Sequence, residues 1–255
     1  MVERKLPKLE TGVRFPSSAL AWQHYGLGRL GYSDPPGRRT FLATPSEIVA
    51  GCRRCHPVRM PESGPKADLH RYLQAAREAL LWKLDGLSEY DVRRPMVPTG
   101  TNLLGLVKHV ASVEAGYFGE TFGRPFGERL PWFEDGAEPN ADMWATAEES
   151  RELIVGLYHR VWSHSDATIE ALPVDAIGHV PWWPPDRSEV TLHRILVHMI
   201  AETHRHAGHA DIVRELIDGA VGLRAGNDNM PSGDRAWWDS YRSRLERAAK
   251  DASSA

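Results

Sequence analysis

Apolar residues recur every three or four positions in several long segments of this chain, and that period restricts the fold more than any other feature. The first segment runs from about residue 67 to residue 85. Its apolar residues at helical spacing are Leu69, Tyr72, Leu73, Ala76, Leu80 and Leu84. No comparable segment alternates apolar and polar residues, although "IGHVPWW" could form a short extended piece. The chain is therefore predicted to be all-α.

Capping residues set the limits of the next two helices. One helix follows Thr101 or Asn102, both good N-caps, and continues through "LLGLVKHVASVEAGYFGETF". Another opens at "TAEE", where Thr146 and Glu149 have the spacing of a capping box, and runs to about Leu172.

The last two helices follow a linker rich in Pro and Trp, "LPVDAIGHVPWWPPDRSE". The fourth helix is predicted from near Thr191 to Gly219, and "DRAWWDSYRSRLERAAKDA" forms a fifth. Four long helices with two long connections indicate a four-helix bundle, to which the fifth adds a C-terminal helix.

Residues 1–65 lack this period and are rich in Pro, Gly and Arg. We expect them to form an irregular extension, either disordered or untranslated, before a helical bundle domain at 66–255. The helical pattern begins abruptly at Met60, and one hypothesis is that translation starts at this residue. The motif "CRRCH" at 52–56 matches covalent haem attachment. Haem attachment is rejected because no export segment is visible. Cys52 and Cys55 are also not interpreted as half of a zinc site, because the sequence has no second cysteine pair.

Composition narrows the class of protein. The chain has 255 residues, of which 42% are hydrophobic and 25% charged, as in globular proteins. A formal charge of -3 without a Lys/Arg stripe argues against nucleic-acid binding. No apolar run approaches the roughly 20 residues that span a membrane, and two cysteines fit a reducing compartment. We expect a soluble cytoplasmic protein.

Histidines cluster in the fourth helix, in the stretch "AETHRHAGHADIVREL". On a helical wheel, Glu202 and His206 lie four residues apart on the core side. The other histidines of this helix point elsewhere: His193 and His204 toward solvent, His198 and His209 at the edge of the apolar arc. An inward Glu/His pair at this spacing can give two ligands to a metal from one helix.

A third ligand should come from another helix, and His109 is the candidate because it borders the apolar side of its own helix. Two His and one carboxylate leave a coordination position open for water or substrate, which suits a catalytic divalent metal. Zinc is the default, and nickel, iron or cobalt are chemically allowed. The alternative stays open that His109 is a boundary histidine and that Glu202 and His206 are an ordinary helical pair.

Several other residues have two readings. Glu114 could orient a ligand histidine, or it could be a helix-boundary carboxylate paired with an arginine. His198 and His209 could support the site or bind a polar substrate, or simply be exposed. Trp182 to Asp186 could wall a pocket or pack the linker, and Arg205 could meet an anionic substrate or form a surface salt bridge.

Two stretches, "GTNLLGLVKHVASVEAGYF" and "LHRILVHMIAETHRHAGHADIVRELIDG", resemble the DinB/YfiT-like metalloenzyme superfamily, and most closely its mycothiol-transferase-like branch. The likeness runs from about residue 66 to residue 249. It implies a DinB-like bundle with a metal held by one ligand from the second helix and two from the last bundle helix. Many members have His at all three positions, and this chain resembles the variant with Glu in the middle. Carried over by motif, the ligands are His109, Glu202 and His206.

The resemblance also implies a function. A divalent metal would bind mycothiol or another low-molecular-weight thiol and activate it to attack an electrophilic small molecule, in a transfer or an isomerisation. The partners would be that thiol and that electrophile, and a homodimer is an option that nothing in the sequence specifies. Two alternatives remain: a metal-dependent hydrolase that uses bound water, and a non-catalytic metal- or ligand-binding stress protein.

Overall fold

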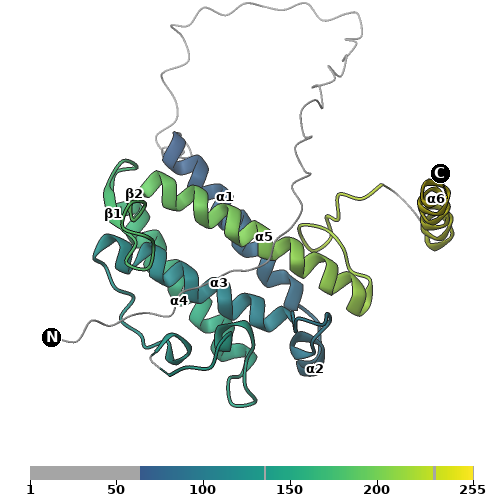
Figure 1. Cartoon of the computed structure of the whole chain (residues 1–255), viewed down its shortest axis with the longest axis horizontal. Coiled ribbons are helices and arrows are strands. Elements are labelled where there is room, and N and C mark those ends of the chain that lie inside the picture. Colours follow the sequence, from purple (N-terminus) through teal and green to yellow (C-terminus); the bar gives the residue numbers. More distant parts are fainter. Residues whose placement is uncertain (1–63, 135, 232–233, 255) are drawn as a thin grey trace, which may run out of the picture. The chain divides into compact units, whose positions relative to one another are not determined.

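A computed structural model of the chain describes residues 64–134, 136–231 and 234–254. The expectations for the extension at 1–65, for Met60 and for the "CRRCH" motif fall almost wholly outside these residues. In the described part the structure is all-α apart from one two-stranded sheet, as predicted (Figure 1).

The helices and strands of the described residues follow in chain order. They are α1 (Pro65–Leu81), α2 (Glu89–Arg93), α3 (Leu103–Phe118), α4 (Arg151–Ala171), β1 (Ile177–His179), β2 (Glu189–Thr191), α5 (Leu192–Asp218) and α6 (Arg235–Ser253). Short 3₁₀ turns lie at Trp82–Leu84, Glu120–Phe122, Pro131–Phe133 and Ala141–Met143.

The four long helices α1, α3, α4 and α5 form the bundle. Helix α1 packs along α5, and α3 packs against both α4 and α5 (Figure 1). Fully buried side chains from all four helices meet between them, among them Leu80, Val107, Tyr158 and Ala210. Helix α3 contributes buried residues along most of its length. It is therefore the central helix of the bundle, and side chains on it reach neighbours on two sides.

Caps fix the ends of the two helices that matter most for the site. The Asn102 side chain accepts a hydrogen bond from the backbone N–H of Gly105 at 2.8 Å, so α3 begins where its cap predicts. The Thr191 hydroxyl accepts from the N–H of Arg194 at 3.2 Å, and Gly219 ends α5 with φ +80°. Gly tolerates this left-handed conformation. The predicted limits of the histidine-bearing helix are confirmed.

The predicted start of the third helix is wrong by several residues. Helix α4 begins at Arg151, with Ser150 as its N-cap. The Glu149 carboxylate does accept from the N–H of Thr146, at 2.7 Å, but this bond closes a separate turn before the helix. Two caps stand close together here, and the sequence pattern alone favours the wrong one.

Other local differences are small. The first predicted helix ends as α1 at Leu81, and a 3₁₀ turn carries the chain to Leu84. Tyr72, assigned to its apolar face, is 64% exposed. The suggested extended piece is β1, which pairs antiparallel with β2, and that partner strand and α2 were not predicted.

Two further features complete the fold. Helix α6 is the predicted additional C-terminal helix, and none of its described side chains is buried. Among the helices of the described residues, none is long and apolar enough to cross a membrane.

Candidate metal centre

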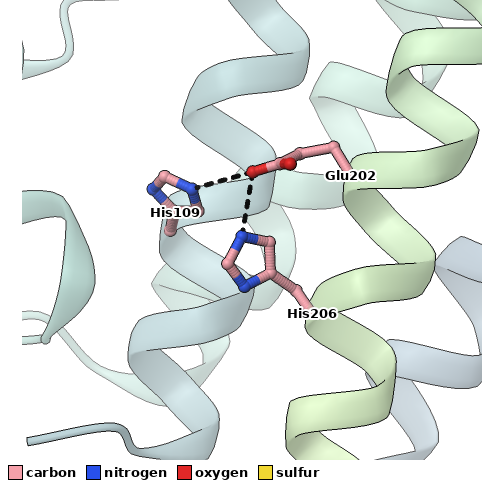
Figure 2. A group of neighbouring side chains, drawn as sticks. All are labelled: His109, Glu202 and His206. Carbon is pink, nitrogen blue, oxygen red and sulfur yellow. Dashed lines mark hydrogen bonds and ion pairs between the residues drawn. The ribbon is translucent and has the colours of Figure 1, made fainter. Parts of the chain in front are cut away.

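The three predicted ligands come together between α3 and α5. His109 lies on α3, and Glu202 and His206 lie one turn apart on α5. One potential ligand atom from each lies within 4.8 Å of the others. Figure 2 shows both imidazole rings directed toward the carboxylate of Glu202. Helix wheels and the superfamily likeness thus selected residues that the fold does bring together.

The carboxylate of Glu202 is the centre of the cluster. Its Oε1 accepts a hydrogen bond from Nε2 of His206 at 3.0 Å and lies 3.7 Å from Nε2 of His109. The two imidazole rings meet edge to face, with their centroids 4.8 Å apart. Both Nε2 atoms and Oε1 therefore face one point. Two imidazole nitrogens and a carboxylate oxygen are the donors that a divalent cation such as zinc takes, so the residues fit a metal ion.

Partial burial makes the charges at this cluster strong. The side chains are 15% exposed for His109, 23% for Glu202 and 9% for His206, so the cluster is shielded yet still reachable from solvent. Burial lowers the pKa of His109, but its contacts with Asp142 and Glu202 outweigh this and raise the pKa to about 9. The contacts with His109 and His206 hold the pKa of Glu202 well below its ordinary value, against the effect of burial. The carboxylate thus holds positive charge close to itself.

A fourth residue, Asp142, orients His109. The Asp142 carboxylate accepts a hydrogen bond from Nδ1–H of His109 at 2.6 Å. Burial raises the pKa of Asp142, but the bond to His109 and its charge lower the pKa overall, so this acceptor is ionised at neutral pH. In the neutral imidazole that a metal ion binds, this bond keeps the proton on Nδ1 and directs the Nε2 lone pair at the centre of the cluster, as metal-binding histidines require. By contrast, Nδ1 of His206 is buried and has no hydrogen-bond partner among the described residues.

The loop that carries Asp142 is tied down on α3. The buried Lys108, next to His109, donates from Nζ to the carbonyl oxygens of Ala141 and Trp144 at 2.8 and 3.0 Å and pairs with Glu149. Asn102 donates to the carbonyl of Met143 at 3.2 Å. Gly105 permits this approach, because a Cβ there would overlap the Met143 carbonyl oxygen. The position of Asp142 is therefore set by α3 itself.

Aromatic side chains lie beside the cluster, toward the start of α5. Tyr117, two turns after His109 on α3, meets the rings of Trp182 and His198 edge to face, with centroids 5.2 and 4.6 Å away. Burial, chiefly, and the charge of Glu202 raise the pKa of Tyr117. The "PWWPPD" segment thus packs the linker against the helices, which was one of its two interpretations. Its tryptophans also form an aromatic wall near the site.

Glu114 does not orient a ligand. It is fully buried and accepts from two guanidinium nitrogens of Arg77 on α1, at 2.5 and 3.2 Å. The alternative was a carboxylate at the helix boundary, paired with an arginine. The arginine partner is confirmed, but the pair lies inside the bundle and not at its boundary. The orienting residue is Asp142, which the sequence reasoning missed because it lies in an irregular loop with no period or motif to mark it.

The remaining residues singled out in the sequence lie outside the centre. His193 is exposed, as predicted, and His204 is half-buried. His209 is exposed, and its ring lies 5.4 Å from that of His206. Arg205 is exposed, and no acidic group of the described residues lies within ion-pair distance of it, so the predicted surface salt bridge is not formed.

Fold and site together define an all-α bundle protein with a His/Glu/His cluster between two of its long helices. The sequence model of the family described as mycothiol-S-transferase matches residues 68–219, more than half of the chain. The chain therefore belongs to the mycothiol-S-transferase family, and its resemblance to the mycothiol-transferase-like branch is confirmed. A search of curated proteins finds no match.

Proposed function

We propose that this protein is a divalent-metal-dependent S-transferase that uses a low-molecular-weight thiol such as mycothiol to attack an electrophilic small molecule. Family membership supports the thiol chemistry. The observation that carries the proposal is the convergence of His109, Glu202 and His206 on one point between α3 and α5. We assign these three residues as the metal ligands and zinc as the metal, with nickel, iron or cobalt as chemically acceptable replacements.

The bound cation would supply one effect, a lowered pKa of a coordinated thiol, which is otherwise mostly protonated at neutral pH because its pKa is about 8.5. The protein supplies the rest. Glu202 brings the negative charge that holds a cation, and His109 is kept in the right tautomer by Asp142. The side chains of His109, Glu202 and His206 each keep part of their surface exposed to solvent, so a small thiol and an electrophile can reach the centre.

Metal content and thiol dependence test this proposal together. Elemental analysis of protein purified without an affinity tag is expected to give about one divalent metal per chain. Activity is measured as the loss of free thiol in the presence of a simple electrophile. Conversion of the electrophile should require both the metal and the thiol. His206→Ala should lose metal and activity. His193→Ala removes an exposed histidine from the same helix and should keep both.

Other outcomes separate the alternatives. Turnover without any added thiol would replace the proposal with a metal-dependent hydrolase that uses bound water. A metal whose removal by a chelator abolishes cooperative unfolding, in a protein without turnover, would indicate a structural metal and a binding protein. No metal in the wild type after reconstitution would overturn the ligand assignment.

A further inference from the structure

A second feature near the start of α5 has no part in the centre described above. A cavity of about 220 Å³ is lined by Trp183, Pro184, Arg187 and Arg194. Three of these residues come from the loop between β1 and β2, and Arg194 lies in the first turn of α5. This volume is smaller than the several hundred Å³ of a typical pocket for a whole ligand, so it suits one group of a larger molecule.

Both arginines of this cavity are exposed, and together they give it positive charge. Neither guanidinium group has an acidic partner within 4 Å, or a side-chain hydrogen bond, among the described residues. Arg77 and Arg214, by contrast, are buried and paired with carboxylates. An anion in this cavity would be attracted by both guanidinium groups. Guanidinium groups bind carboxylates through two parallel hydrogen bonds.

Trp183 supplies a fixed apolar surface next to these charges. Its indole N–H donates to the hydroxyl of Tyr117 at 3.0 Å, and its ring meets that of His198 with centroids 5.4 Å apart. The guanidinium carbon of Arg194 lies 5.0 Å from the Trp183 ring centroid. The ring and one guanidinium group are therefore already placed relative to each other, which lowers the entropy lost on binding a ligand.

The cavity and the candidate metal centre lie along the same stretch of α5. Arg194, His198 and Glu202 follow one another at intervals of one turn. At ~1.5 Å per residue, Arg194 and Glu202 are separated by about 12 Å along the helix axis. His198 and Tyr117, which contact each other, lie between the two ends. A molecule held at Arg194 by one end could thus present its other end at Glu202.

We propose that the cavity lined by Trp183, Arg187 and Arg194 binds the carboxylate of an elongated organic anion whose apolar body lies against Trp183. We assign this anion to the electrophilic substrate, an assignment that rests on the proposed function. The anion site itself does not, because its residues hold the charge and the ring without metal or thiol.

Binding is tested first, on the full-length protein without metal or thiol. The probe is benzoate, with benzamide as its uncharged counterpart, and the readout is the NMR cross-peak of the Trp183 indole N–H, assigned by its loss in Trp183→Phe. Benzoate is expected to shift this peak saturably and benzamide to leave it in place. Arg187→Gln and Arg194→Gln should each weaken benzoate binding roughly tenfold, the usual effect of losing one charged hydrogen bond. Arg205→Gln, an exposed arginine on the same helix, should leave it unchanged.

Two results would overturn the anion site: equal shifts with benzoate and benzamide, or unchanged benzoate binding when Arg187 and Arg194 are both replaced by Gln. Neither result bears on the metal or the thiol, so the proposed function would stand. If benzoate binds as expected and thiol transfer is absent, the anion site stands and the proposed function fails.

Kinetics of the metal-loaded enzyme then show which substrate binds in the cavity. Arg194→Gln should raise the KM of a carboxylate-bearing electrophile about tenfold and leave the KM of its amide analogue unchanged, with little effect on kcat. A raised KM for the thiol, whichever electrophile is present, would contradict the assignment to the electrophile and indicate that the thiol occupies the cavity.

Discussion

Two polar clusters lie within the bundle, and they deal with charge in opposite ways. At the first, the fully buried Arg77 is paired with Glu114 and with Asp166, and Asp166 also accepts from His70. At the second, Glu202 faces two histidines and remains partly exposed. In the first cluster every charged group has a partner, whereas the second gathers donor atoms around a point that a cation or protons can fill. Buried charge alone therefore does not indicate a metal site, and convergence of donor atoms on one point is the feature that supports the proposed one.

The difference between the two clusters is tested most directly by the same substitution, Glu→Gln, at Glu114 and at Glu202. Glu114→Gln leaves the buried Arg77 short of one charge, and breaking a buried pair costs about 3–5 kcal/mol. We expect a loss of roughly 3 kcal/mol in the free energy of unfolding, measured with urea on metal-free protein. The metal bound per folded chain should not change.

A double variant controls for this first prediction. Replacing both partners, Arg77→Met with Glu114→Leu, removes the unpaired charge and should recover most of the lost stability. If the double variant is as unstable as Glu114→Gln, packing rather than charge explains the effect.

Glu202→Gln should give the reverse pattern. The amide keeps the shape of the side chain but loses the charge that a cation requires, so metal affinity should fall by more than about 100-fold. Competition with a chelator measures this. The unfolding free energy of the metal-free variant should fall by about 1–2 kcal/mol, less than for Glu114→Gln, because this carboxylate is only partly buried. Metal affinity like that of the wild type would remove Glu202 from the ligand set.

Asp142→Asn should have a smaller effect on the same property. Losing the charged acceptor of Nδ1–H frees the orientation of His109, and such losses cost about 10–100-fold in metal affinity. Recorded on metal-free protein well above pH 9, where the His109 ring is neutral, the histidine nitrogen NMR spectrum should show a mixture of His109 tautomers in place of one. Glu138→Gln removes an exposed carboxylate from the same loop and serves as the control. If both variants bind metal equally well, Asp142 does not position the ligand.

The smallest effect is expected at Asp166, the partly exposed carboxylate of the first cluster. Burial raises its pKa, but His70 and Arg77 outweigh this and lower the pKa below the ordinary value of 3.8. Its stabilisation is therefore present above pH 3.8 and is lost as the pH falls through the folded-state pKa. Asp166→Asn should cost about 1 kcal/mol at pH 7 and progressively less in acid.

Urea unfolding at a series of pH values measures this difference. Asp175→Asn, at an exposed carboxylate without a cationic partner within 4 Å in the described region, should match the wild type throughout. A difference between Asp166→Asn and the wild type that does not shrink in acid would exclude the ion pairs as its cause.

The sequence predicted what depends on local pattern. Helical period and caps gave the start of α3 and both ends of α5, and the wheel placed His109, Glu202 and His206 on inward faces. The predicted end of α3 at Phe122 was wrong, because the helix stops at Phe118 and a 3₁₀ turn follows. The sequence failed to predict Ser150 as the N-cap of α4, because Thr146 and Ser150, four residues apart, can each cap a turn and local sequence does not rank them. It also missed Asp142 and the Arg77 partner of Glu114. Both contacts join segments more than 30 residues apart, so they depend on how the chain packs.

Gly105 shows how such packing constrains what can be changed. Replacing a helical glycine with alanine usually makes a helix more stable, by roughly 0.5–1 kcal/mol, and it is a standard step in engineering thermostable proteins. Here the added methyl group would meet the Met143 carbonyl and push the loop, with Asp142, away from His109. An engineer who optimised α3 as a helix would weaken the centre one turn away, at a residue that touches none of the three proposed ligands.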